Sequence, residues 1–156
     1  MHKLFLCAAL LAAARLLPGA EDSFAGTWKY NPGLSKTPFT EPGMAIKEAT
    51  MIIQETGDLV SVTITGTKEN GSPVSVRYAT SFRGGPVNYS EGGPALGIVA
   101  SRRVSHRMVD FIATQDGKVI STNHATVSPG GEVLRFDAKG VDERGKRFHS
   151  VTVFEK

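Results

Sequence analysis

The chain has a single cysteine, Cys7, which lies within its first 20 residues. These residues combine a basic start, an apolar run from Leu4 to Ala14 and a small-residue end, which is the pattern of a cleavable secretory signal peptide. The run is shorter than the roughly 20 apolar residues that a transmembrane helix needs. We therefore expect a signal peptide at 1–20 and an exported domain at 21–156, periplasmic or extracellular, with neither a disulfide nor a thiol nucleophile. Cleavage after Ala14 and a helix that belongs to the domain are the alternatives.

An excess of charge of one sign is also missing once this leader is set aside. The chain has 18 Lys and Arg residues against 15 Asp and Glu residues, and Lys3 and Arg15 belong to the leader. The remaining 16 basic residues give a net charge of +1, whereas a nucleic-acid-binding domain normally shows a strong, clustered excess of positive charge. We expect no nucleic-acid partner. Because no second long apolar run follows, we also expect no integral membrane segment in the mature chain.

Catalytic and cofactor motifs are absent as well. The sequence contains no G-x-S-x-G elbow, no P-loop and no dinucleotide-binding fingerprint. The histidines that follow the leader, His106, His124 and His149, have neither H-x-H nor H-E-x-x-H spacing. We therefore expect no catalytic residue, no metal site and no cofactor, and the sequence does not indicate an enzyme.

Helical periodicity is missing from the mature part, where no stretch of ten residues has apolar positions at i, i+3, i+4 and i+7. Turn dipeptides recur instead at regular spacing, which is typical of a chain of β-hairpins; they are Thr56-Gly57, Asn70-Gly71, Asp116-Gly117, Gly130-Gly131 and Arg144-Gly145. We expect strands near 25–31, 47–55, 58–67, 73–82, 98–104, 106–114, 118–127, 133–141 and 146–154, and a short tenth near 86–89. Nine or ten sequential antiparallel strands hide their edges by closing into an up-and-down barrel, with a β-sandwich as the alternative.

In the first half of the chain, the alternation of apolar residues predicts how the strands pair. A three-residue turn at 69–71 sets Val62 opposite Tyr78 and keeps Tyr78 on the inward, apolar face of its strand. A two-residue turn at Thr56-Gly57 sets Ile53 opposite Val60 and keeps Ile53 inside.

The second half has a more polar inner face. Phe136 points inward because the residues on either side of it, Arg135 and Asp137, are charged. Three-residue turns at 129–131 and around Arg144 then set Phe136 opposite His124 and Thr152. The expected inner face also holds Ile120, Thr122, Thr126, Phe148, Ser150 and Phe154. Polar groups that face inward need partners, which can be each other, water or a ligand.

Asp110 is an acid that the choice of turn can bring near His124. A three-residue turn around Asp116-Gly117 would do so. The two-residue turn that is usual for Asp-Gly leaves Asp110 outside and directs a better apolar face inward, formed by Val109, Phe111 and Ala113. We therefore expect no acid–base pair in the lumen.

A basic group brackets a turn that we expect at Val104-Ser105. We interpret it as a solvated hairpin tip, because charge runs at turns are ordinary. A carboxylate or phosphate site is the alternative, since arginine side chains suit both anions. The group consists of Arg102, Arg103, His106 and Arg107.

The string Gly26-Thr27-Trp28-Lys29-Tyr30-Asn31, followed by Ser35-Lys36, resembles secreted bacterial lipocalin-like domains of the calycin type. The resemblance extends to the hairpin at 116–118 and the closing strand at 151–156. It implies a lipocalin-like barrel in which Gly26 and Trp28 are structural. Trp28 would close one end and pack against a basic side chain from a late strand, with Arg135, Lys146 and Arg147 as candidates.

Together these features predict an all-β, antiparallel, up-and-down lipocalin-like barrel of about nine or ten strands behind a cleavable signal peptide. Its expected function is to bind a small apolar or amphipathic molecule in the lumen, through Tyr78, His124, Phe136 and Thr152. A structural or protein-interaction barrel without a ligand is the alternative, and a hydrolase or isomerase is the least favoured.

Overall fold

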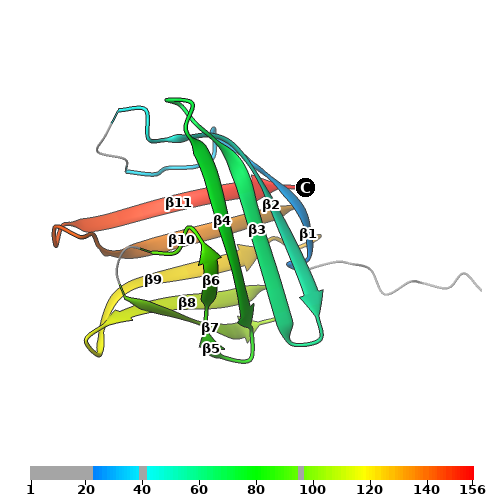
Figure 1. The fold of residues 1–156 in the computed structure, drawn as a ribbon. Helices are drawn as coiled ribbons and strands as arrows, with labels where there is room; N and C mark the ends of the chain where they lie inside the picture. The colour runs from blue at the N-terminus through cyan, green and yellow to red at the C-terminus, as the bar shows by residue number, and fades with distance from the viewer. Residues whose placement is uncertain (1–22, 39–41, 95–96) are drawn as a thin grey trace, which may run out of the picture.

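A computed structural model describes residues 23–38, 42–94 and 97–156, and the predicted signal peptide at 1–20 lies outside them. The described residues form one antiparallel sheet that curls into a nearly closed barrel (Figure 1). Its strands are β1 (Gly26–Tyr30), β2 (Ile46–Thr56), β3 (Leu59–Lys68), β4 (Pro73–Ser81), β5 (Gly85–Pro86), β6 (Asn88–Glu91), β7 (Ile98–Ser105), β8 (Met108–Gln115), β9 (Lys118–Val127), β10 (Val133–Val141) and β11 (Arg147–Glu155). Their order is β5-β7-β8-β9-β10-β11-β1-β2-β3-β4-β6.

The described residues thus contain eleven strands, where the sequence predicts nine or ten. The difference lies in the glycine-rich segment between β4 and β7, which forms two short strands instead of the single one expected near 86–89. β5 pairs with β7, and β6 pairs with β4. This segment therefore crosses the gap between the two ends of the sheet.

Hydrogen bonds between β4 and β7 close the barrel at one end. Thr80 Oγ1 and Ser101 Oγ lie 2.6 Å apart, and both residues are buried. The Arg103 N–H donates to the carbonyl oxygen of Phe82 at 2.7 Å, just beyond the last residue of β4. This end, which also holds the β2–β3 and β7–β8 turns, is called the closed end below.

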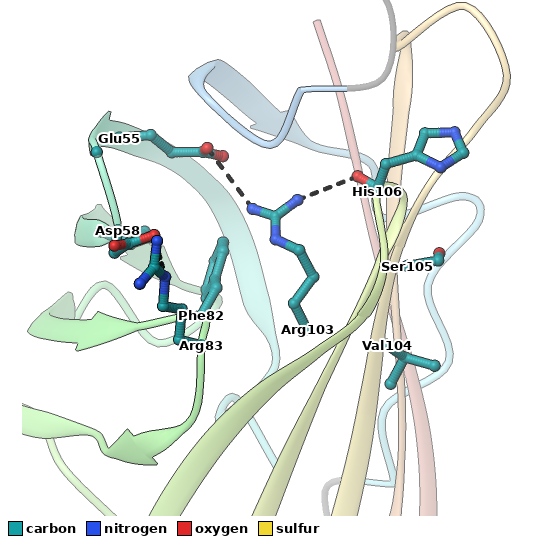
Figure 2. A pocket seen from close by; sticks show the side chains of 10 residues that line it. Glu55, Asp58, Phe82, Arg83, Arg103, Val104, Ser105 and His106 are labelled. Carbon is teal, nitrogen blue, oxygen red and sulfur yellow. Dashed lines mark hydrogen bonds and ion pairs between the residues drawn. The ribbon is translucent and has the colours of Figure 1, made fainter.

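Arg103 lies at the closed end and not at a solvated hairpin tip (Figure 2). The β7–β8 turn is formed by His106 and Arg107, two residues later than predicted, because β7 continues to Ser105 with a register shift after Arg103. The guanidinium of Arg103 lies 5.0 Å from the ring centre of Phe82 and pairs with Glu55 at 3.6 Å. It also donates to the carbonyl oxygen of His106 at 3.3 Å.

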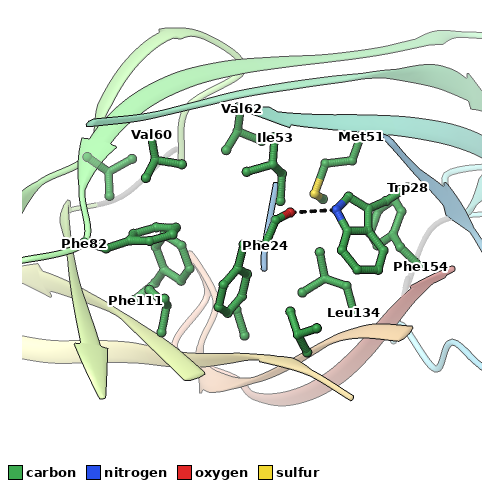
Figure 3. Packing of buried hydrophobic residues seen from close by; sticks show 14 of the residues in the cluster. Phe24, Trp28, Met51, Ile53, Val60, Val62, Phe82, Phe111, Leu134 and Phe154 are labelled. Atoms are coloured by element: carbon green, nitrogen blue, oxygen red, sulfur yellow. Dashed lines mark hydrogen bonds between the residues drawn. The ribbon is translucent and has the colours of Figure 1, made fainter. Parts of the chain in front are cut away.

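Trp28 is completely buried beside this end and donates from Nε1 to the carbonyl oxygen of Phe24 at 2.8 Å (Figure 3). The basic residue that packs on its ring is Lys156, with Nζ 4.6 Å from the ring centre. None of the three basic residues that we predicted for this contact therefore makes it. Gly26 has a φ of 140°, and a Cβ at this position would lie 3.0 Å from the Lys156 side chain. Glycine before the tryptophan therefore makes room for the lysine.

Strand pairing in the first half agrees with the predicted faces. Val62 pairs with Tyr78, as the three-residue turn at 69–71 requires. The β2–β3 turn is Gly57-Asp58 rather than Thr56-Gly57, so Ile53 pairs with Val62. Gly57 has a φ of 61° and stands at the first turn position, where a type II′ turn requires glycine. The shift is by an even number of residues, so Ile53 still points inward and is buried.

Strand β9 shows the main departure from prediction. The Asp116-Gly117 turn has two residues, as expected, but a bulge at Ile120 follows: Thr114 pairs with Val119, whereas Ala113 pairs with Ser121. A bulge shifts every later residue to the opposite face of the strand.

The turn after β9 accommodates this shift. It has four residues, 129–132, between the bonded Ser128 and Val133, one more than predicted. Phe136 consequently pairs with Ala125 and not with His124. The inward position predicted for His124 is therefore wrong, and the same holds for Thr122 and Thr126. The residues of β9 that face inward after the bulge are Ser121, Asn123, Ala125 and Val127.

Candidate ligand-binding lumen

A cavity of about 600 Å³ occupies the half of the barrel away from the closed end. Its volume lies within the range of about 300–1,000 Å³ that is usual for small-molecule sites. Its lining residues come from most strands of the barrel: Ile46, Met51, Ile64, Val74, Val76, Tyr78, Tyr89, Gly92, Pro94, Val99, Phe111, Ala113, Ile120, Ser121, Asn123, Phe136, Ala138, Val141, Asp142, Glu143, Phe148, Ser150, Thr152 and Phe154. Most of these side chains are apolar.

The wall formed by β2, β3 and β4 is apolar and ends in a group of aromatic rings. Met51, Ile64 and Val76 line it, one from each strand. The ring centre of Tyr78 lies 5.2 Å from that of Tyr89. Burial, with a smaller effect from the neighbouring Tyr89, raises the pKa of Tyr78 far above its usual range, and burial also raises the pKa of Tyr89. Both phenols therefore stay uncharged at neutral pH.

The wall formed by β9, β10 and β11 carries polar but uncharged side chains. Pairing places Asn123 of β9, Ala138 of β10 and Ser150 of β11 in one row across the sheet. The next row, farther from the closed end, contains Ser121 and Gly140. We call Ser121, Asn123, Ser150 and Thr152 the polar strip. A Cβ at Gly140 would collide with the backbone of Ile120 and Ser121, so the close approach of β9 requires glycine there.

The hydrogen-bonding groups of the polar strip are unsatisfied within the protein. Asn123 Oδ1 is buried and has no hydrogen-bond partner. Among the described residues, the hydroxyls of Ser121, Ser150 and Thr152 also lack a hydrogen bond. Buried polar groups are normally paired with protein, water or ligand. The polar strip is therefore available to the contents of the cavity.

Among the described lining residues, charge occurs only on Asp142 and Glu143, at the mouth of the cavity in the β10–β11 turn. Asp142 Oδ1 accepts hydrogen bonds from the backbone N–H groups of Arg144 at 2.9 Å and Lys146 at 2.8 Å. This carboxylate therefore fixes the turn. No Lys, Arg or His is found among the described residues that line the cavity.

Three of the four residues predicted for the site line the cavity, and one does not. Tyr78, Phe136 and Thr152 line it, although their role in binding stays a prediction. His124 lies on the outer face with half of its side chain exposed, and its Nδ1 lies 2.6 Å from Asp110 Oδ1. Asn123, on the opposite face of the same strand, was not predicted. The sequence signal for the inward position of Asn123 was that Ala125 and Val127, which share its face of the strand, form a more apolar face than His124 and Thr126.

The outer face of the same sheet carries paired charges. Cross-strand pairing places Arg102, Asp110, His124 and Asp137 in one row over β7 to β10. Asp137 accepts hydrogen bonds from Arg135 at 2.9 Å and from His149 at 3.0 Å. The hydrogen bond from Arg135 is the largest effect and lowers the pKa of Asp137; burial opposes it with a smaller effect, and the bond from His149 lowers the pKa further by a still smaller one. The sheet separates all these groups from the cavity.

A second pocket, of about 690 Å³, lies at the closed end and is mostly polar (Figure 2). Its charged side chains are paired: Arg103 with Glu55, and Arg83 with Asp58 at 2.8 Å. An apolar ligand would have to displace water from these ion pairs without replacing their hydration. This pocket therefore suits an apolar ligand less well than the lumen does.

The chain matches no protein-family model, and comparisons with curated proteins and with solved structures find no match either. The nearly closed, all-β antiparallel barrel is consistent with a lipocalin-like fold. Over the described ranges there is no helix with the length and hydrophobicity for a membrane crossing. The same ranges hold no group of three or more His, Cys, Asp or Glu side chains that could bind a metal ion.

Proposed function

We propose that this chain is an exported, lipocalin-like container that binds one small apolar or amphipathic molecule in its lumen. The observation that carries the proposal is the cavity of about 600 Å³, with its largely apolar lining, next to the buried hydrophobic cluster of the closed end. Burial of apolar surface contributes about 25 cal/mol per Å². A ligand that buries about 350 Å² would gain about 9 kcal/mol, part of which is lost on immobilisation.

A small residue on the lumen wall supports this function over that of a structural barrel. A barrel without a ligand gains stability when large side chains fill its interior. Here Ala138 of β10 lines the cavity, whereas Leu134 of the same strand is completely buried at the closed end. The strand therefore carries a large apolar residue where the barrel is packed and a small residue, Ala138, on the cavity wall.

Titration with N-phenyl-1-naphthylamine, an uncharged fluorescent probe, tests this function. We expect saturable binding at micromolar concentration, which corresponds to about −8 kcal/mol. An aliphatic alcohol should displace the probe. Absence of saturable binding, together with no shift in thermal unfolding by apolar compounds, would contradict the container function and favour the structural or interaction barrel.

A further inference from the structure

The two walls of the lumen differ in the groups that they offer to a ligand. The wall of β2 to β4 presents Met51, Ile64 and Val76, and the wall of β9 to β11 presents the polar strip. In Figure 1 the first set of strands crosses in front of the second. A molecule in the lumen therefore meets apolar side chains on one side and hydroxyl and amide groups on the other.

The polar strip is extended rather than concentrated at one point. Ser121 and Asn123 follow each other along β9, and Ser150 and Thr152 follow each other along β11. The buried oxygen of Asn123 lacks a partner, and the residue lines the lumen. A ligand with one terminal head group would leave most of the strip unpaired, which costs free energy for each buried polar group.

The lumen offers an anionic head hydroxyl and amide donors but no opposite charge. No cationic side chain of the described residues lines it, and the charged side chains in its described lining, Asp142 and Glu143, are acidic. Burial of a carboxylate costs far more hydration free energy than burial of a hydroxyl, and a cation that could offset this cost is missing from the described lining.

We propose that the lumen selects uncharged amphipathic molecules that carry hydroxyl or amide groups along one edge, and that Asn123 is the main specificity residue. This inference rests on the container function proposed above. The apolar edge of the ligand lies against β2 to β4, and its hydrogen-bonding edge lies along the polar strip. Fatty-acid anions are poor ligands on this account.

Competition between ligands of equal chain length tests the selection. N-phenyl-1-naphthylamine is bound first and then displaced at pH 7.5 by decane-1,5-diol, whose hydroxyls are spaced along the chain, or by decanoate. The diol should displace the probe at a concentration about tenfold lower than decanoate, because burial of an unpaired charge costs more than burial of hydroxyls that find partners. Equal or tighter binding of decanoate would overturn the inference.

Substitutions in β9 test whether Asn123 is responsible for the selection. Asn123→Leu keeps the size of the side chain and removes the amide, so it should weaken diol binding about fivefold relative to probe binding, the loss of one hydrogen bond. Thr122→Val, on the outward face of β9, is the matched control and should change neither. Ser150→Ala repeats the test from the neighbouring strand in case Asn123→Leu does not fold.

The outcomes separate the two proposals. If the probe does not bind to the unmodified protein, the container function fails, and this inference fails with it. If the probe binds but decanoate competes as well as the diol, or both Asn123→Leu and Ser150→Ala leave the preference unchanged, the container function stands and the selection by the polar strip is wrong.

Discussion

The closed end and the lumen are built by the same strands but have opposite interiors. Leu134 of β10 and Phe154 of β11 are buried against the core at the closed end. Two rows further along the same strands, Ala138 and Ser150 lie side by side on the wall of an open cavity. The aromatic rings Phe24, Trp28 and Phe82 all belong to the packed part (Figure 3). The comparison indicates that the closed end stabilises the barrel, while the lumen has room for the ligand that we propose.

The largest effect should come from Trp28→Ala at the closed end. Deletion of a large buried aromatic side chain costs about 3–5 kcal/mol of the free energy of unfolding, which urea denaturation measures. Trp28 is the only tryptophan of the chain, so its emission should be blue-shifted and unaffected by a ligand in the lumen. An emission maximum typical of exposed tryptophan would mean that the closed end is not packed as described.

The same substitution in the two regions should have different effects on stability. Ala125→Leu enlarges a side chain that is 1 % exposed beside the core, and overpacking of this kind costs about 1–3 kcal/mol. Ala138→Leu places the added carbons in the cavity, so it should cost less than about 1 kcal/mol and weaken probe binding. Equal destabilisation by both variants would show that the lumen is as tightly packed as the closed end.

A smaller effect is expected on the outer face, where the folded state lowers the pKa of Asp137. A carboxyl group with a lowered pKa in the folded state stabilises that state when the pH is above its ordinary pKa of 3.8. This stabilisation is lost as the pH falls through the pKa of the folded state. Asp137→Asn should therefore lower the free energy of unfolding slightly at pH 7 and have no effect near pH 2. Probe binding should not change, and a clear loss of binding would contradict the separation of the outer face from the lumen.

Removal of the leader should not affect either region. The exported protein should begin near Glu21, which intact-mass measurement of the secreted material would show. A chain that starts at Glu21 should unfold at the same denaturant concentration as the full-length chain. A mature protein that retains its first 20 residues would contradict export by a cleavable signal peptide.

Side-chain alternation in the sequence was sufficient to predict which residues point inward in the first half of the barrel and in part of the lumen. Tyr78 lies in a strictly alternating strand, and Phe136 lies between two charged residues, so each has one plausible face. His124 was misplaced because β9 is mixed: both of its faces contain polar side chains, and neither the bulge at Ile120 nor the four-residue turn at 129–132 leaves a clear sequence signal. The partner of Trp28 depends on a tertiary contact with the last residue of the chain, which no local pattern predicts.

Paired substitutions on β10 test the central claim most directly. Phe136 lines the cavity, and its neighbour Arg135 points outward and donates to Asp137. Binding of N-phenyl-1-naphthylamine is measured by fluorescence for Phe136→Ala and Arg135→Ala, after urea denaturation has shown that both variants are folded. We predict that Phe136→Ala raises the dissociation constant about tenfold through lost apolar contact, while Arg135→Ala changes it less than about twofold. Equal effects of the two substitutions would contradict binding in the lumen.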